Sequence, residues 1–277
     1  MRARLRVCLS FSAVLLALPC STARADVVIN GLDDDLRANV QSLMRLDDQP
    51  CDVPARRIEA ELDRAHEAVR TGLEAFGYYE PEVSSELEIL DECWRVTFAV
   101  AVGERVLLRN VDIDIRGSAA TDATFAALIR ESRIASMMPL LHGNYDALKQ
   151  ALRTLAIERG YRDAQFIEST IDVYPDQHVA DLRIVFDSGE RYRFGEIELV
   201  QDVVSNELLN GYVEAARGEF YDSRRLAEAR LELIDSGYFS TVSIDPGVPD
   251  SQARVIPVRI RLAPAARAQV NYGFGFS

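Results

Sequence analysis

The residue types that most often carry catalysis are few in this chain, and their spacing is unsuited to it. The three histidines, His66, His142 and His178, are far apart in the sequence. His66 lies on an expected helix beside charged neighbours, which predicts a solvated surface histidine and not a base or a metal ligand. Ser236 precedes Gly237 without the flanking pattern of a nucleophile elbow. The sequence therefore predicts a protein that is not an enzyme.

Two further patterns suggest binding chemistry but have simpler explanations. Asp33, Asp34 and Asp35 could bind a cation, yet they stand where a helix is expected to begin, and negative charge stabilises a helix N-terminus. Gly273-Phe274-Gly275 follows no strand-to-helix turn, so it does not indicate a nucleotide site. We expect no cofactor and no metal.

The first 25 residues have the pattern of an export signal. A basic start of Arg2, Arg4 and Arg6 precedes an apolar run over residues 7–18, and Ala23-Arg24-Ala25 favours cleavage before Asp26. Attachment of lipid at Cys20 is the weaker alternative, because Leu18-Pro19 is a poor approach to a lipidated cysteine. Cleavage removes four arginines and no acidic residue, so the net charge changes from −13 to −17. Such an acidic chain repels phosphate backbones, which predicts no nucleic-acid partner.

Two cysteines remain after this cleavage, Cys51 and Cys93. In an oxidising compartment, two thiols within one small domain most simply form a disulfide. The alternative is a pair of free, partly buried thiols. A metal site would need four ligands, and no histidine pair lies nearby.

A repeated pattern organises the rest of the chain. Gly77-Tyr78, Gly160-Tyr161 and Gly237-Tyr238 each end an expected helix, and they recur about every 80 residues. Gly103-Glu104-Arg105 recurs in the same way as Gly189-Glu190-Arg191. Fixed spacing of this kind indicates tandem copies of one small domain.

Each copy is predicted to be a β-α-α-β-β module, so the fold class is α+β. Its three-stranded mixed sheet would carry two helices on one face. The expected modules cover residues 26–105, 106–192 and 193–267. The expected helices cover residues 33–44, 54–76, 121–130, 145–159, 205–215 and 222–235. The expected strands cover residues 27–29, 83–89, 94–100, 111–115, 166–173, 182–186, 197–199, 241–245 and 256–262.

Residues 268–277 break this pattern. Val270, Tyr272, Phe274 and Phe276 alternate with small or polar residues, which is typical of an outer-membrane barrel strand. The other interpretation is a frayed tail. A barrel needs many such strands, so we expect either a fragment of a longer protein or a product without the barrel.

Three segments together carry a resemblance to a known family. They are Val28-Ile29-Asn30-Gly31-Leu32, Leu73-Glu74-Ala75-Phe76-Gly77-Tyr78-Tyr79-Glu80-Pro81, and Tyr272-Gly273-Phe274-Gly275-Phe276-Ser277. With the β-α-α-β-β repeat, they resemble the polypeptide-transport-associated (POTRA) domains of the outer-membrane assembly superfamily, in particular its TamA-type branch.

The resemblance implies a function, a location and partners. The function is assembly of outer-membrane and autotransporter proteins. The location is the cell outer membrane, facing the periplasm, with attachment to the membrane through a barrel. The partners are unfolded outer-membrane or autotransporter polypeptides and a TamB-like periplasmic protein. The alternative function is a free-standing periplasmic scaffold or adaptor built from the same module.

A three-stranded sheet leaves edges that can accept an extended client segment by main-chain hydrogen bonding. We expect the second strand of each module to be such an edge, unless a neighbouring module covers it. The candidate residues on these edges are Val83, Leu87, Ile89, Ile167, Ile171, Val242 and Ile244.

Overall fold

The computed structural model describes residues 25–91, 93–201 and 217–265. The expected signal peptide, the expected helix at residues 205–215 and the expected barrel strand at residues 268–277 lie outside these ranges. The barrel-strand residues Val270, Tyr272, Phe274 and Phe276 are therefore outside them as well.

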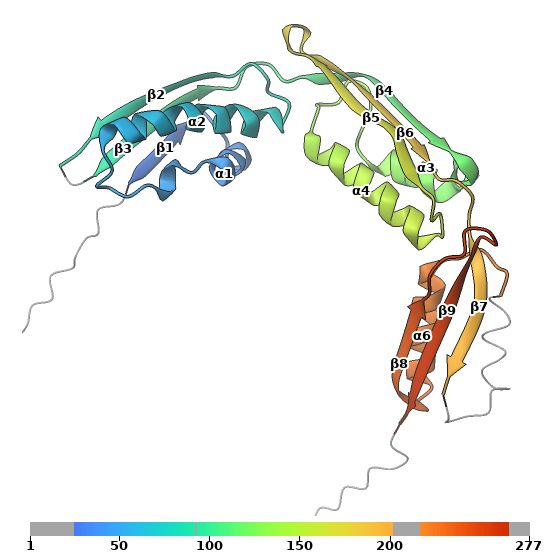
Figure 1. Cartoon of the computed structure of the whole chain (residues 1–277). Helices are drawn as coiled ribbons and strands as arrows, with labels where there is room; N and C mark the ends of the chain where they lie inside the picture. The colour runs from blue at the N-terminus through green and yellow to red at the C-terminus, as the bar shows by residue number, and fades with distance from the viewer. Residues whose placement is uncertain (1–24, 92, 202–216, 266–277) are drawn as a thin grey trace, which may run out of the picture. The chain divides into compact units, whose positions relative to one another are not determined.

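Three separate three-stranded sheets follow one another along the chain (Figure 1). The first sheet and its helices are β1 (Asp26–Asn30), α1 (Asp34–Leu43), α2 (Ala55–Glu74), β2 (Glu82–Ile89) and β3 (Trp94–Ala101). The second sheet and its helices are β4 (Leu107–Arg116), α3 (Ala123–Glu131), α4 (His142–Glu158), β5 (Gln165–Tyr174) and β6 (Val179–Asp187). The third group is β7 (Arg193–Val200), α6 (Ser223–Asp235), β8 (Phe239–Pro246) and β9 (Val255–Pro264). Short 3-10 turns lie at Leu46–Asp48, Gly117–Thr121 and Pro175–Gln177.

The sheets share one topology, with the last strand in the centre. Their orders are β1-β3-β2, β4-β6-β5 and β7-β9-β8. The central strand runs parallel to the first strand and antiparallel to the second, which confirms the predicted mixed sheet. The central strand has a neighbouring strand on each side, and its residues that face the helices are apolar and buried. In β3, Trp94, Val96, Phe98 and Val100 face inward and are buried.

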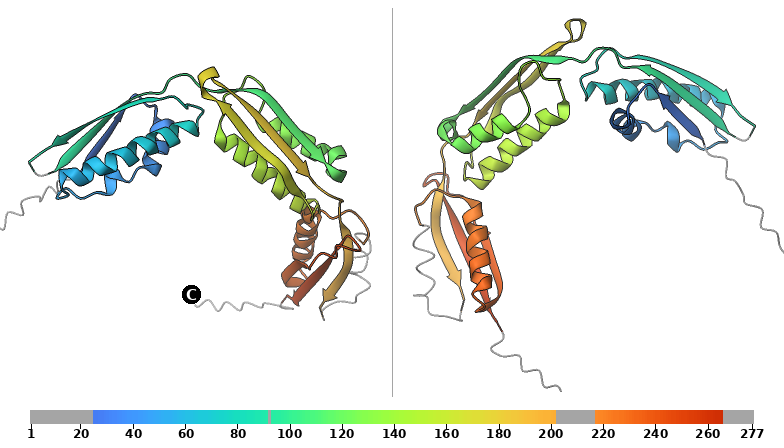
Figure 2. Two further views of the ribbon diagram at one scale, coloured as in Figure 1. Left: turned by 45° about the horizontal axis from the view of Figure 1, so that its top comes forward. Right: turned by 180° about the vertical axis from the view of Figure 1, so that it is seen from behind.

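The helices lie on one face of each sheet, as Figures 1 and 2 show. Asp33 caps α1 by accepting a hydrogen bond from the Leu36 amide at 2.9 Å. This contact confirms that the aspartate cluster belongs to a helix N-terminus. Helix α2 buries a stripe at helical spacing, formed by Ile58, Ala65, Val69 and Leu73.

Glycine ends the long helices for a backbone reason. Gly77 follows α2 with φ +88°, and Gly160 follows α4 with φ +81°. Side chains other than glycine are strained in this left-handed region, so glycine is the residue that reverses the chain here. The expected helix stops are confirmed at both positions.

The second and third sheets have separate apolar cores. Around the second sheet, Phe125, Leu152, Tyr161, Ile184 and Phe186 are among the buried residues. Around the third, the core contains the residues Tyr192, Phe194, Tyr221, Leu233, Phe239 and Ile256. No single core runs across Gly189 in the described chain.

Contacts divide the chain into two compact units. One contains the chain up to Val69 with Glu82–Ala101; the other contains Arg70–Pro81 and the chain from Val102 onward. The second and third sheets thus belong to one unit. Each unit is described by itself below.

A disulfide joins Cys51 to Cys93 within the first unit. The next residue, Trp94, is buried and its indole donates a hydrogen bond to the Pro50 carbonyl at 3.2 Å. The covalent link and this hydrogen bond both join the loop before α2 to the start of β3.

His66 is not the solvated residue that the sequence predicts. Its ring lies edge-on to Phe98, with ring centroids 5.6 Å apart, and its Nε2 is 2.9 Å from Ser85 Oγ. The expectation is wrong because His66 lies on the side of α2 that faces the sheet. Its role there is packing and a local hydrogen bond.

Candidate functional site: open strand edges and a joint within the second unit

The expected client residues all lie on edge strands. Val83, Leu87 and Ile89 are on β2, Ile167 and Ile171 on β5, and Val242 and Ile244 on β8. In the part of the chain that the structure describes, each of these strands pairs only with the central strand of its sheet. They lie on three different sheets and do not form one site.

The side chains of these residues differ in how far they are exposed to a client. Val242 is buried, and Ile171 and Ile244 pack against their cores. Ile89 and Ile167 are exposed, at 63% and 54%. Any pairing common to the three edges must therefore use the main chain, with side chains adding to it differently in each sheet.

The opposite edges of the second and third sheets are partly covered by loops of the same module. Leu108 on β4 exchanges main-chain hydrogen bonds with Met137 and Met138, at 2.7 and 2.8 Å. Phe194 on β7 does the same with Gly218 and Glu219, at 3.0 and 2.9 Å. Among the described residues, the open edges are consequently those of β2, β5 and β8, together with the short strand β1.

Among these open edges, β2 has the longest pairing without a register shift. The pairing of β5 with β6 shifts at Ile167, and the pairing of β8 with β9 shifts at Ser240. Such bulges are one way in which proteins make an edge a poor template for another strand. Strand β2 pairs with β3 over eight consecutive residues, Glu82–Ile89, without a shift.

The sheet face away from the helices carries a repeated pattern of ion pairs, and we call it the outer face. In the second sheet, Arg183 on the central strand bonds Asp112 and Glu168 on the two edges, each at 2.8 Å. In the first sheet, Arg95 is 2.7 Å from Asp26 and 3.9 Å from Glu88. These pairs are exposed and screened by solvent, so they add little to stability and mainly keep the outer face soluble.

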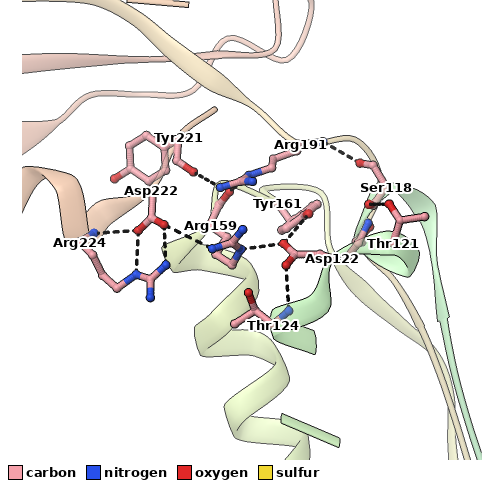
Figure 3. Close-up of polar contacts among 12 residues, drawn as sticks. Ser118, Thr121, Asp122, Thr124, Arg159, Tyr161, Arg191, Tyr221, Asp222 and Arg224 are labelled. Atoms are coloured by element: carbon pink, nitrogen blue, oxygen red, sulfur yellow. Dashed lines mark hydrogen bonds and ion pairs between the residues drawn. The ribbon is translucent and has the colours of Figure 1, made fainter. Parts of the chain in front are cut away.

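A denser polar cluster joins the second sheet to the third within the second unit (Figure 3). We call it the junction network: Asp122, Arg159, Tyr161, Arg191, Tyr221 and Asp222. Arg159 lies at the end of α4, between the two aspartates that cap α3 and α6. It donates from Nε to Asp122 at 2.7 Å, and its Nη1 lies 3.4 Å from Asp222. The three side chains are only 15%, 9% and 13% exposed.

Arg191 completes this network through main-chain acceptors. It donates to the Arg159 carbonyl at 2.7 Å and to the Tyr221 carbonyl at 3.0 Å. Its guanidinium also lies over the Tyr161 ring, 5.7 Å from the centroid. Arg105 lies over Tyr78 in the same way, 4.6 Å from the centroid. The recurring Gly-Tyr and Gly-Glu-Arg motifs are therefore contact partners.

Burial, hydrogen bonds and neighbouring charges shift the pKa values of the junction network. Burial would raise the pKa of Asp122, but hydrogen bonds from the Thr124 amide, Arg159 and Tyr161 outweigh it and hold the pKa below its ordinary value. The Arg224 guanidinium is the main cause that lowers the pKa of Asp222. Burial, followed by the charge of Asp122, raises the pKa of Tyr161 to about 12.

These shifts predict acid sensitivity of the junction network. A carboxyl group with a lowered folded pKa stabilises the fold above its unfolded pKa of about 3.9, and this contribution is lost as the pH falls through the folded pKa. We expect the urea midpoint of the wild type to fall below about pH 4. In Asp122→Asn/Asp222→Asn the fall should be smaller, since asparagine still caps a helix but does not titrate. Asp235→Asn, an exposed change on α6, is the control; equal falls in all three proteins would contradict the prediction.

The sequence analysis missed Arg159 and gave Arg191 no role. The recurrence of Gly103-Glu104-Arg105 as Gly189-Glu190-Arg191 was the signal for Arg191. Arg159 stands directly before Gly160, and its partners are 37 and 63 residues away in the sequence. No local pattern connects them.

Residues 25–91, 93–201 and 217–265 contain no cluster suited to a metal ion. Within those ranges there is no group of three or more histidine, cysteine, aspartate or glutamate side chains placed to hold a metal ion. Among the described helices, none combines the length and apolarity needed to cross a membrane.

Comparison with known proteins agrees with the fold. Residues 26–102 match the family model described as POTRA domain TamA domain 1. POTRA domains of the Omp85 family are non-enzymatic scaffold domains.

Three solved structures are similar to most of the chain. POTRA3-5 of BamA from Haemophilus influenzae is 18% identical with a TM-score of 0.44, over 87% of this chain and 95% of that one. The N-terminal domain of Omp85 from Thermosynechococcus elongatus is 17% identical with a TM-score of 0.32, over 88% and 97%. POTRA1-3 of the periplasmic domain of Omp85 from Anabaena is 16% identical with a TM-score of 0.30, over 88% and 95%.

The match over residues 26–102 is specific to one kind of domain, and the strand orders of the second and third sheets repeat that of the first. Residues 26–102 thus match a POTRA domain, and all three sheets have the POTRA-like α+β fold.

Proposed function

We propose that this chain is the periplasmic arm of an outer-membrane assembly factor that receives client polypeptides by strand pairing. The clients are unfolded outer-membrane or autotransporter polypeptides, and a TamB-like periplasmic protein is the further partner. The arm is exported and attached to the outer membrane through a barrel. The TamA-type match of residues 26–102 supports this choice within the superfamily.

The observation that carries the proposal is the distribution of open and covered edges. Loops cover the beginning of β4 and of β7, whereas β2, β5 and β8 have no described partner on their outer side. Open edges expose main-chain donors and acceptors, which can pair with an extended segment of almost any sequence. Tolerance of sequence is what a receiver of many different clients needs. The regularity of β2 makes it the first edge on which we expect pairing.

Hydrogen exchange tests the edge directly. We expect a nine-residue peptide of alternating valine and threonine to slow amide exchange in β2 of the full chain by about tenfold at saturation. The amides of Leu107 and Leu108, which already have loop or strand partners, serve as the internal control. No slowing in β2, β5 or β8 at any peptide concentration would refute strand pairing.

A genetic experiment tests the cellular role. Deleting residues 26–267 from the full gene is expected to abolish secretion of autotransporters, measured as their amount at the cell surface. An unchanged outer-membrane proteome after the deletion would contradict this role. Such a result would favour a free-standing periplasmic scaffold instead.

A further inference from the structure

On the outer face, β2 carries more carboxylates without an ion pair than the other open edges do. Glu82, Ser84, Glu86 and Glu88 are exposed and alternate with Val83, Ser85, Leu87 and Ile89. Of the three carboxylates, only Glu88 has a recorded cation, Arg95 at 3.9 Å. In the described part of the chain, no arginine, lysine or histidine forms an ion pair with Glu82 or Glu86.

The open edges of β5 and β8 are closer to charge balance. Glu168 on β5 bonds Arg183 at 2.8 Å, and Asp245 on β8 bonds Arg261. Thr170 on β5 and Ser243 on β8 carry no charge, and Asp172 on β5 is exposed and forms no ion pair in the described part of the chain. Within the described residues, a strand that pairs with β5 therefore meets one carboxylate without an ion pair, Asp172, and a strand that pairs with β8 meets none, whereas β2 presents Glu82 and Glu86.

The surface beside Glu82 is also hollowed. Small side chains on the two neighbouring strands, Ser84, Ala99 and Ala101, help to line a hollow of about 360 Å³ together with Glu82. Ser84 lies opposite Ala99, and Glu82 lies opposite Ala101. A long side chain from an added strand could lay its aliphatic stem over these small residues and bring a charged end to a glutamate.

The inward side of the same edge has the opposite character. Val83, Ser85 and Leu87 are half-buried, and Ser85 contacts His66 of α2. Ile89 is 63% exposed. An added strand would cover these residues, so its inward side chains should be apolar.

On the basis of the proposed strand pairing, we infer that β2 selects extended segments in which lysine or arginine alternates with apolar residues. The cationic side chains lie on the outer face beside Glu82 and Glu86, with their stems over the hollow at Ala99. The apolar side chains lie on the inner face beside Val83 and Leu87. Residues on adjacent strands of one face are about 5 Å apart at Cβ, close enough for charge to discriminate between segments.

Three labelled nine-residue peptides test this selection with the full chain. Valine alternates with lysine in the first, with threonine in the second and with glutamate in the third; binding is measured by fluorescence anisotropy. We expect the lysine peptide to bind about tenfold more tightly than the glutamate peptide, with threonine between, because two positions change from like to opposite charge. The ratio should shrink from 50 to 500 mM salt, where the screening length becomes short.

Charge-matched variants separate the edge from the overall acidity of the chain. Glu82→Gln/Glu86→Gln should bring the lysine and threonine peptides to nearly equal affinity. Glu59→Gln/Glu67→Gln removes the same charge from exposed positions on α2 and should leave the preference unchanged. All four positions are exposed, so the fold does not depend on them. An equal loss of preference in both variants would overturn the inference, because net charge alone would then explain it.

The outcomes distinguish this inference from the function on which it rests. Equal affinities for the three peptides, with slowed exchange in β2, would overturn charge selection and leave strand pairing intact. Absence of slowed exchange in β2 with all three peptides would overturn pairing at this edge and the inference with it. Slowed exchange in β2 with the affinity order lysine, threonine, glutamate supports both.

Discussion

Loss of the Cys51–Cys93 disulfide is expected to lower the free energy of unfolding of the first sheet and its helices by about 4 kcal/mol. The two cysteines are 42 residues apart, and closing a loop of this length restricts the unfolded chain by about that amount in the chain-entropy account. The measurement is urea unfolding of Cys51→Ser/Cys93→Ser, followed by tryptophan fluorescence. Trp94 is the one tryptophan of the chain, so the signal reports the first sheet alone.

The remaining sheets provide the control for this experiment. The described strands and helices from β4 onward contain no cysteine, so reducing agent should leave their unfolding unchanged. An unchanged fluorescence midpoint in the double serine variant would show that the disulfide does not stabilise this part of the protein. A lower urea midpoint for all three sheets would show that the first sheet is coupled in stability to the other two, which their separate topologies do not predict.

Replacement of Arg159 by methionine is expected to cost about 3 kcal/mol in the stability of the second unit. Methionine keeps much of the apolar stem but leaves two poorly exposed aspartates without the shared cation, and breaking such a pair costs several kcal/mol when it is buried. The effect should be larger at α3 than at α6, because Asp222 keeps Arg224 at 2.7 Å whereas Asp122 has no second recorded arginine partner in the described chain.

Amide exchange at the two helix caps resolves this asymmetry. The Thr124 amide donates to Asp122 and the Arg224 amide donates to Asp222, each at 3.0 Å. We expect the Arg159→Met variant to accelerate exchange more at Thr124 than at Arg224. Arg130→Met, an exposed change at the end of α3, should alter neither amide. Equal exchange in Arg159→Met and the wild type would mean that Arg159 does not support the caps.

Much of the fold was predictable because its signals are local. The stripe of Ile58, Ala65, Val69 and Leu73 and the alternation from Trp94 to Val100 are periodicities that each element carries in its own sequence. The helix stops at Gly77 and Gly160 reflect a backbone conformation that side chains disfavour. Repetition strengthened each of these predictions, because an element present in one module was expected in the others.

The position of His66 and the contacts of the junction network were not predictable because both depend on residues that are distant in the sequence. His66 lies at the margin of an apolar stripe, where sequence alone does not show whether Phe98 will lie beneath it. Arg159 meets Asp122 and Asp222 only after three helix ends come together, and a single arginine beside a glycine has no pattern of its own. Strand β2 pairs without a register shift and β5 does not, and this difference depends on a bulge at Ile167. No residue type at that position predicts the bulge.

The place of Arg159 has a consequence for anyone who transplants parts of this protein. The guanidinium that supports the first turn of α6 comes from the end of α4, beside the second sheet, so a graft that begins at residue 193 leaves it behind. A recipient array would have to offer its own arginine at the corresponding helix end, or the splice point would have to move upstream into α4. Whether two modules fit together thus depends on the residue at the end of α4, and not on the loop where a domain boundary is usually placed.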